Sequence, residues 1–122
     1  RDPANVTALN NAAWNLRLDE PAQALEYIRR AARAAPDRPE VLDTLAVIEH
    51  LNGENRSAYR NIERALAGAP QNPSLRYHKA MIGASLGEKD QAIALLEELL
   101  ADDAPAFPEQ AEAESLLKKL SG

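Results

Sequence analysis

Two histidines, His50 and His78, are the side chains best suited to proton transfer or metal binding in this chain of 122 residues. They fall at non-equivalent places on two predicted helices, and a metal site would need further ligands that converge on them. We therefore interpret His50 as a groove or surface residue and His78 as a packing or capping residue.

No other residue pattern indicates catalysis. The acidic pairs Glu97-Glu98 and Asp102-Asp103 are adjacent in the sequence, so their side chains diverge on a helix. The absence of cysteine excludes disulfides and thiolate metal sites, and the chain contains no glycine-rich phosphate loop, nucleophile motif or HExxH motif. We predict that the protein is not an enzyme and that it uses no cofactor and no metal.

The overall charge argues against nucleic acid as a partner. Lys and Arg number 14 and Asp and Glu number 19, a formal net charge of −5, whereas phosphate binding depends on a positive surface. We interpret a local basic cluster as a solvated helix face rather than a patch for an acidic partner; its members are Arg29, Arg30, Arg33 and Arg38. Apolar runs are only a few residues long, so we expect no membrane span.

The elements that must position these residues follow a period of 34. Shifting residues 36–69 by 34 places Gly53 on Gly87 and Ala58 on Ala92. Within each unit, apolar residues at three-and-four spacing form two runs that a turn separates, and prolines separate successive units. This pattern predicts a series of helical hairpins, in which small residues such as Ala58 let the helix axes approach closely.

The repeats define the predicted domain organisation. We expect one domain over residues 1–122. It contains three repeats, at about 4–35, 36–69 and 70–103, and a capping helix at about 107–120. The last helix carries an apolar stripe that would cover the third hairpin. The stripe consists of Leu116, Leu117 and Leu120. Asp2-Pro3 is typical of the end of a preceding repeat, so we expect the chain to begin within a longer protein.

The second unit carries an ordered series of large and small residues: Leu42, Leu45-Ala46, Ala58, Ile62, Ala65 and Pro70. This series resembles the tetratricopeptide repeat (TPR) family. Glu49 stands where that family usually has tyrosine, and the third unit has Lys79 and Gly83 where leucine and tyrosine are expected. The resemblance implies an all-α, right-handed α-solenoid of three TPR hairpins and a C-terminal capping helix.

A finer resemblance concerns origin. The strings ALNNAAW and LDTLAVIEH, and the histidine in LRYHKA, are similar to the C-terminal repeats of large bacterial TPR proteins associated with exopolysaccharide and protein-sorting systems of the cell envelope. This resemblance implies a bacterial protein and leaves both the cytoplasm and the periplasm open.

The TPR resemblance also implies a binding surface, because the first helix of each hairpin lines a concave groove in that family. Equivalent positions place Trp14, Val47 and Met81 in an apolar ladder along this groove. The predicted partner-binding residues are Asn10, Trp14, Arg17, Asp43, Val47, His50, Tyr77 and Met81. They suit an apolar or amphipathic segment of a protein or peptide. The alternative is that Trp14 and Met81 only fill gaps between helices.

Two further expectations concern the partner. Some TPR proteins hold a terminal carboxylate with basic residues, but the matching positions here include no lysine or arginine; they are Asn10, Trp14, Thr44, Ser74 and His78. We therefore do not expect recognition of that kind. A second functional hypothesis is a structural spacer, or a module that self-associates through an uncapped N-terminal face around Leu9.

Overall fold

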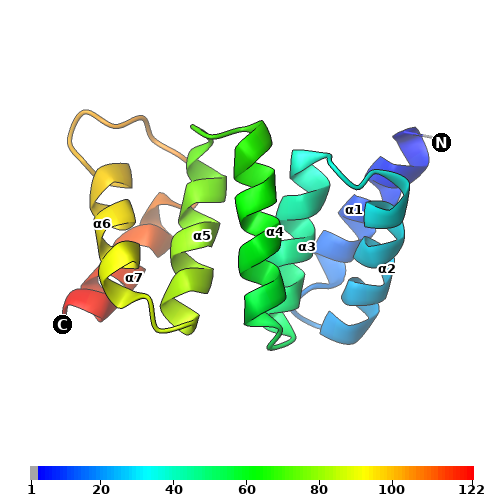
Figure 1. Cartoon of the computed structure of the whole chain (residues 1–122), viewed down its shortest axis with the longest axis horizontal. Coiled ribbons are helices and arrows are strands. Elements are labelled where there is room, and N and C mark those ends of the chain that lie inside the picture. The colour runs from blue at the N-terminus through cyan, green and yellow to red at the C-terminus, as the bar shows by residue number, and fades with distance from the viewer. Residues whose placement is uncertain (1–2) are drawn as a thin grey trace.

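The computed structural model describes residues 3–122, which form seven α-helices and no strand (Figure 1). The helices are α1 (Pro3–Leu16), α2 (Pro21–Ala34), α3 (Pro39–Leu51), α4 (Asn55–Gly68), α5 (Pro73–Ser85), α6 (Lys89–Leu99) and α7 (Gln110–Ser121). Residues 1 and 2, and with them Asp2 of the predicted end of a preceding repeat, lie outside the described range. Within residues 3–122, no helix combines the length and the apolar character that a membrane crossing requires.

Two hairpin turns depend on a glycine with a positive φ. Gly53 lies between α3 and α4 with φ 82°, and Gly87 lies between α5 and α6 with φ 87°. At the first turn, the Glu54 N–H donates to the Glu49 carbonyl at 2.8 Å, and the Gly53 N–H donates to the His50 carbonyl at 3.0 Å. In this Schellman arrangement a left-handed residue reverses the chain while the last helical carbonyls are satisfied. The predicted glycine turns are confirmed.

Proline opens several of the helices. Pro21, Pro39 and Pro73 are the first residues of α2, α3 and α5. A backbone N–H at this position has no partner within the helix, so proline loses nothing there and its fixed φ favours the helix. At α5 the preceding Asn72 also caps the helix, because its side-chain oxygen accepts a hydrogen bond from the Leu75 N–H at 3.2 Å.

Three apolar clusters lie between successive helices instead of around one centre. The first joins α1, α2 and α3 around Ile28, the second joins α3, α4 and α5 around Ile62, and the third joins α5, α6 and α7 around Leu96. Each of these three side chains is fully buried, as are Ala24 and Ala58. Because neighbouring hairpins share each cluster, the core continues along the chain, as it does in solenoids.

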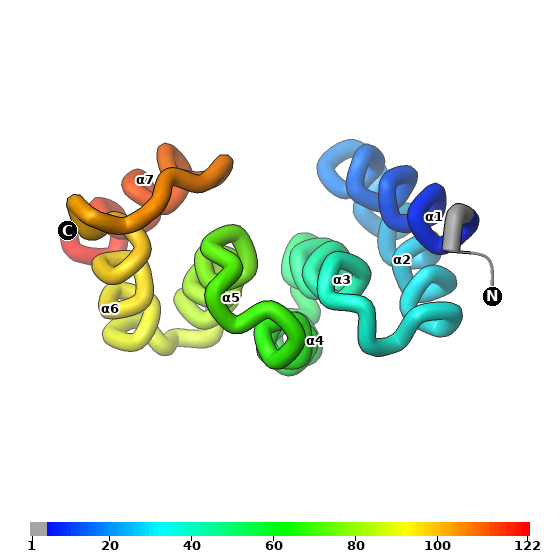
Figure 2. The backbone as a smooth tube through the Cα atoms, turned by 90° about the horizontal axis from the view of Figure 1, so that it is seen from above, coloured from blue at the N-terminus to red at the C-terminus, as the bar shows by residue number. Residues whose placement is uncertain are grey.

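Seen from above, the chain forms an open crescent (Figure 2). The floor of its concave side consists of α3 and α5, α1 and α7 rise at the two ends, and α2, α4 and α6 lie on the outer side. The predicted all-α solenoid is confirmed. In-phase stacking of the hairpins therefore turns the leading helices toward the concave side.

Candidate functional site

A hollow of about 490 Å³ opens on the concave side, between α1, α3, α5 and the segment that leads into α7. Six of the eight residues predicted for partner binding line it: Trp14, Arg17, Val47, His50, Tyr77 and Met81. The structure adds six others, which are Leu18, Leu51, His78, Pro108, Glu109 and Glu112. Asn10 and Asp43, the remaining predicted residues, are not among the lining residues.

The apolar ladder runs across three successive helices. Trp14 lies on α1, Val47 on α3 and Met81 on α5, at intervals of 33 and 34 residues. Val47 is almost fully buried, while Trp14 and Met81 are half-buried, and Met81 also packs against the second and third core clusters. Met81 therefore contributes to the core as well as to the wall of the hollow, whereas Trp14 belongs to none of the three clusters.

Arg17 is held against Trp14. Its guanidinium carbon lies 3.8 Å from the centroid of the indole ring, and its Nη1 donates a hydrogen bond to the Trp14 carbonyl at 2.8 Å. The cation–π contact and the hydrogen bond together orient a side chain that would otherwise sample many rotamers. A positive group is therefore fixed at the α1 side of the hollow.

A hydrogen-bonded pair, the partly buried Asp43 and the buried His78, joins α3 to α5 at the floor. His78 is 5% exposed, and its Nδ1 lies 2.7 Å from the Asp43 Oδ1. The carboxylate can only accept, so the Nδ1 of His78 donates. The His78 ring lies 6.4 Å from the Trp14 ring and 5.5 Å from the Tyr77 ring, measured between centroids. Asp43 therefore contacts His78 and does not line the hollow, and the burial of His78 agrees with its predicted packing role.

The other polar residues predicted for the groove differ in their surroundings. The His50 Nδ1 donates to the Asn55 Oδ1 at 2.6 Å, a contact between the end of α3 and the start of α4. The Asn10 Oδ1 is buried and has no hydrogen-bond partner among the described residues. Of these two, only His50 presents a polar group at the hollow.

Two leucines give the hollow an exposed apolar edge. Leu18 is 68% exposed and Leu51 is 39% exposed, and they are the large hydrophobic side chains classed as exposed among those that the structure describes. Each lies four residues after a member of the ladder, Trp14 or Val47, which places it on the same side of its helix or just beyond the helix end. Helical spacing from the ladder reaches both positions, although only their neighbours Arg17 and His50 were among the predicted partner-binding residues.

The entry to α7 adds acidic residues that the sequence analysis did not assign to the site. Glu109 and Glu112 line the hollow opposite α1, and the Ser74 Oγ donates to the Glu109 Oε1 at 2.6 Å. Burial raises the pKa of Tyr77, and the charges of Glu112 and Glu109 raise it further. Sequence periodicity predicted α7 as a cover for the third hairpin, but it carries no information about which side chains the cover turns toward the groove.

Comparison with known proteins decides the family. A family model described as Tetratricopeptide repeat matches residues 49–120, more than half of the chain. The chain belongs to the tetratricopeptide repeat family. It is 32% identical over 90 residues to the TPR repeat-containing protein PA4667 of Pseudomonas aeruginosa, an alignment that covers 72% of this chain. The chain spans only 14% of the length of that relative.

Two solved structures share the TPR fold of this chain. The Yersinia enterocolitica type III secretion chaperone SycD, in complex with a peptide of the translocator YopD, matches with a TM-score of 0.77 and 18% identity, covering 98% of this chain and 95% of that one. A structure of SycD described as a type III secretion translocator chaperone matches with a TM-score of 0.79 and 17% identity, covering 99% and 86%. At these identities the likeness concerns the fold.

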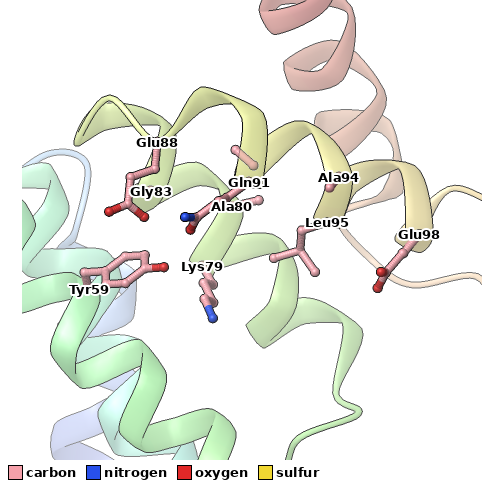
Figure 3. A pocket seen from close by; sticks show the side chains of 10 residues that line it. Tyr59, Lys79, Ala80, Gly83, Glu88, Gln91, Ala94, Leu95 and Glu98 are labelled. Carbon is pink, nitrogen blue, oxygen red and sulfur yellow. The ribbon is translucent and has the colours of Figure 1, made fainter.

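The TPR pattern also explains a second hollow, of about 290 Å³, between α4, α5 and α6 (Figure 3). Gly83 lines this hollow at the place where the TPR family usually has tyrosine, and it contributes no side chain to it. The Tyr59 ring projects from α4 toward Lys79, whose Nζ lies 5.8 Å from the ring centroid. Burial, followed by the charges of Glu88 and Glu63, raises the pKa of Tyr59.

In the second hairpin, the tyrosine place is filled by a buried carboxylate. Glu49 is 4% exposed, and it accepts hydrogen bonds from Ser57 at 2.7 Å and from Asn61 at 2.8 Å. Both donors come from α4, so the Glu49 carboxylate links α3 to α4 by hydrogen bonds. Among the described residues, no group of three His, Asp or Glu side chains is arranged to hold a metal ion.

Proposed function

We propose that this TPR domain binds an apolar or amphipathic segment of a partner protein in its concave hollow. The observation that carries the proposal is the exposed edge formed by Leu18 and Leu51, which opens beside the half-buried Trp14 and Met81. Exposed leucines are common singly, but two that adjoin an aromatic residue and a methionine in one hollow are typical of an interaction site.

The lining residues divide into two roles. Trp14, Met81 and the two leucines supply apolar contact, with the ladder residue Val47 beneath them. Arg17, His50 and Tyr77 supply polar groups that fix the register of the bound segment. Asp43 contributes by holding His78, and Asn10 is left out of the proposed binding set because it does not line the hollow.

The comparisons support this function at the level of the fold. TPR domains are protein-interaction modules, and the structurally similar SycD was solved with a peptide of YopD. We transfer to this chain only the general mode, an extended or helical segment that lies in a groove. The same fold favours a non-enzymatic role, because the function of a domain lies in its sites and this hollow offers contact surface rather than a reactive group.

The test replaces the exposed edge without disturbing the core. Leu18→Asp combined with Leu51→Asp should weaken capture of a partner from bacterial lysate by about tenfold or more, because desolvated anchor residues dominate binding energy. Both side chains are exposed, so the melting temperature should remain within a few degrees of that of the unaltered protein.

A matched control adds the same two charges elsewhere. Ala22 and Ala101 are exposed and do not line the hollow, so Ala22→Asp combined with Ala101→Asp should leave capture unchanged. Undiminished capture by the Leu18/Leu51 variant would refute the proposed site, and equal loss in both variants would show a general charge effect.

The second hypothesis, self-association through α1, receives less support from the structure. Leu9, on which it was based, is half-buried and packs against the first core cluster. Among residues 5–16, the exposed positions of α1 are polar or small, and include Asn5, Asn11 and Asn15. An asparagine-rich surface offers little apolar area for a stable contact between two copies.

A further inference from the structure

The charged groups around the concave hollow are segregated. Arg17 lies just after α1, and Glu109 and Glu112 lie on the opposite side of the hollow, at the start of α7. Figure 2 shows α1 and α7 as the raised ends of the crescent, which face each other across the floor formed by α3 and α5. A bound segment therefore meets different charges at its two edges.

The acidic side has no basic partner within residues 5–122. Some exposed acids pair with bases, such as Glu54 with Arg29 at 2.9 Å and Glu63 with Lys79 at 3.7 Å, whereas no lysine or arginine within residues 5–122 forms such a pair with Glu109 or Glu112. The hydrogen bond from Ser74 orients Glu109 without neutralising it.

In addition to burial, the negative charge of the acidic side raises the pKa of a neighbouring side chain, Tyr77. After burial, Glu112 and Glu109 are the causes that raise the pKa of Tyr77, which lines the same hollow. A cation placed between these carboxylates would meet two favourable charges at short range and an aromatic ring beside them.

We propose that the partner segment is apolar at its centre and carries lysine or arginine where it meets Glu109 and Glu112. This inference rests on the proposed function and specifies its partner. The aliphatic stem of such a residue covers the apolar surface near Met81 and Pro108, while its charged end reaches the carboxylates. Arg17, fixed on the opposite side by Trp14, repels a basic residue there and thereby sets the direction in which the segment lies.

Trp14 provides a direct probe, because it is the only tryptophan of the chain and it lines the hollow. Its emission is measured while the protein is titrated with short synthetic peptides that lack tryptophan and tyrosine. The three peptides share one apolar centre of leucine and methionine and differ only in flanking residues, which are lysine, glutamine or glutamate. The lysine peptide should bind about threefold to tenfold more tightly than the glutamine peptide, as expected for one or two partly exposed ion pairs, and the glutamate peptide should bind most weakly.

A pair of variants separates a local effect from the general attraction of an acidic protein. Glu109→Gln combined with Glu112→Gln should abolish the preference for lysine over glutamine. Glu97→Gln combined with Glu114→Gln removes the same net charge from exposed positions that do not line the hollow, and it should keep the preference. Glutamine retains an acceptor for Ser74, and circular dichroism verifies that each variant is folded.

The outcomes distinguish this inference from the proposed function. Equal affinity for the three peptides would overturn the charge inference while leaving groove binding intact. A lysine preference that survives in the Glu109/Glu112 variant would overturn it as well, because the attraction would then come from the whole surface. If no peptide changes the Trp14 emission at millimolar concentration, the proposed function fails, and the inference fails with it.

Discussion

Gly83 allows a sharp test of the packing, because its replacement by alanine should stabilise the protein. It is a buried glycine within α5, and a Cβ added there would meet only the Tyr59 Cε1, at 3.4 Å. Alanine in place of a helical glycine gains about 0.5 to 1 kcal/mol from the lower entropy of the unfolded chain. Burial of the added methyl group contributes up to about 0.8 kcal/mol more, part of which the close contact with Tyr59 offsets.

The net expectation for Gly83→Ala is therefore a gain of about 1 kcal/mol in the free energy of unfolding. For a domain of this length, that gain corresponds to a rise of roughly 3 to 6 °C in melting temperature. Urea unfolding followed by circular dichroism measures the change directly, provided that the dependence on denaturant is the same in both proteins.

Gly68 supplies the contrasting control. A Cβ on Gly68 would lie 2.9 Å from the Cγ of Pro39, a rigid ring at the start of α3, so the two helices would have to shift. Overpacking of this kind costs about 1 to 3 kcal/mol, which exceeds the gain in helix propensity, so Gly68→Ala should destabilise. A loss of stability in Gly83→Ala, or equal gains in both variants, would refute the packing described for the third hairpin.

Three further predictions address other parts of the fold. Ala58→Leu should cost on the order of 1 to 3 kcal/mol in urea unfolding, because Ala58 is fully buried and a larger side chain would overpack its cluster; a neutral result would mean that the repeat register is wrong. Asn61→Ala should cost about 1 to 3 kcal/mol by leaving the buried Glu49 carboxylate short of a donor, and a cost below that of Ser57→Ala would contradict the assigned hydrogen bond. Burial and nearby carboxylates raise the pKa of Tyr77, so its stabilising contribution is complete below the ordinary value of 10.0 and is lost as pH rises through the folded pKa. Unfolding measured across that alkaline range should therefore depend less on pH in Tyr77→Phe, and an unchanged dependence would contradict this expectation.

Part of the candidate site followed from periodicity. Trp14, Val47 and Met81 occupy one place in three successive units, and stacked repeats carry equivalent places to one side of the solenoid. The same spacing reaches Leu18 and Leu51, which lie four residues further along. Their exposure could not be predicted, because it depends on how far the neighbouring helices extend past them.

Other parts of the site depend on contacts between distant residues. The bond between His78 and Asp43 joins residues 35 positions apart, and the bond between Ser74 and Glu109 does the same. Sequence reasoning assigned Asp43 to the groove surface because equivalent positions in the repeats face the groove. In the folded chain the Asp43 carboxylate accepts a hydrogen bond from the buried His78, and Asp43 does not line the concave hollow.

The amino-acid sequence by itself determined the helical hairpins, the glycine turns and the family, because these depend on the spacing of small, large and breaking residues along the chain. Only the tertiary structure decided that Glu109 and Glu112 face Arg17 across one hollow, and that Gly83 leaves a second hollow beside Tyr59. The physical reason is that spacing sets which face of a helix is apolar, whereas the angle and depth at which helices pack determine which polar side chains meet across a gap.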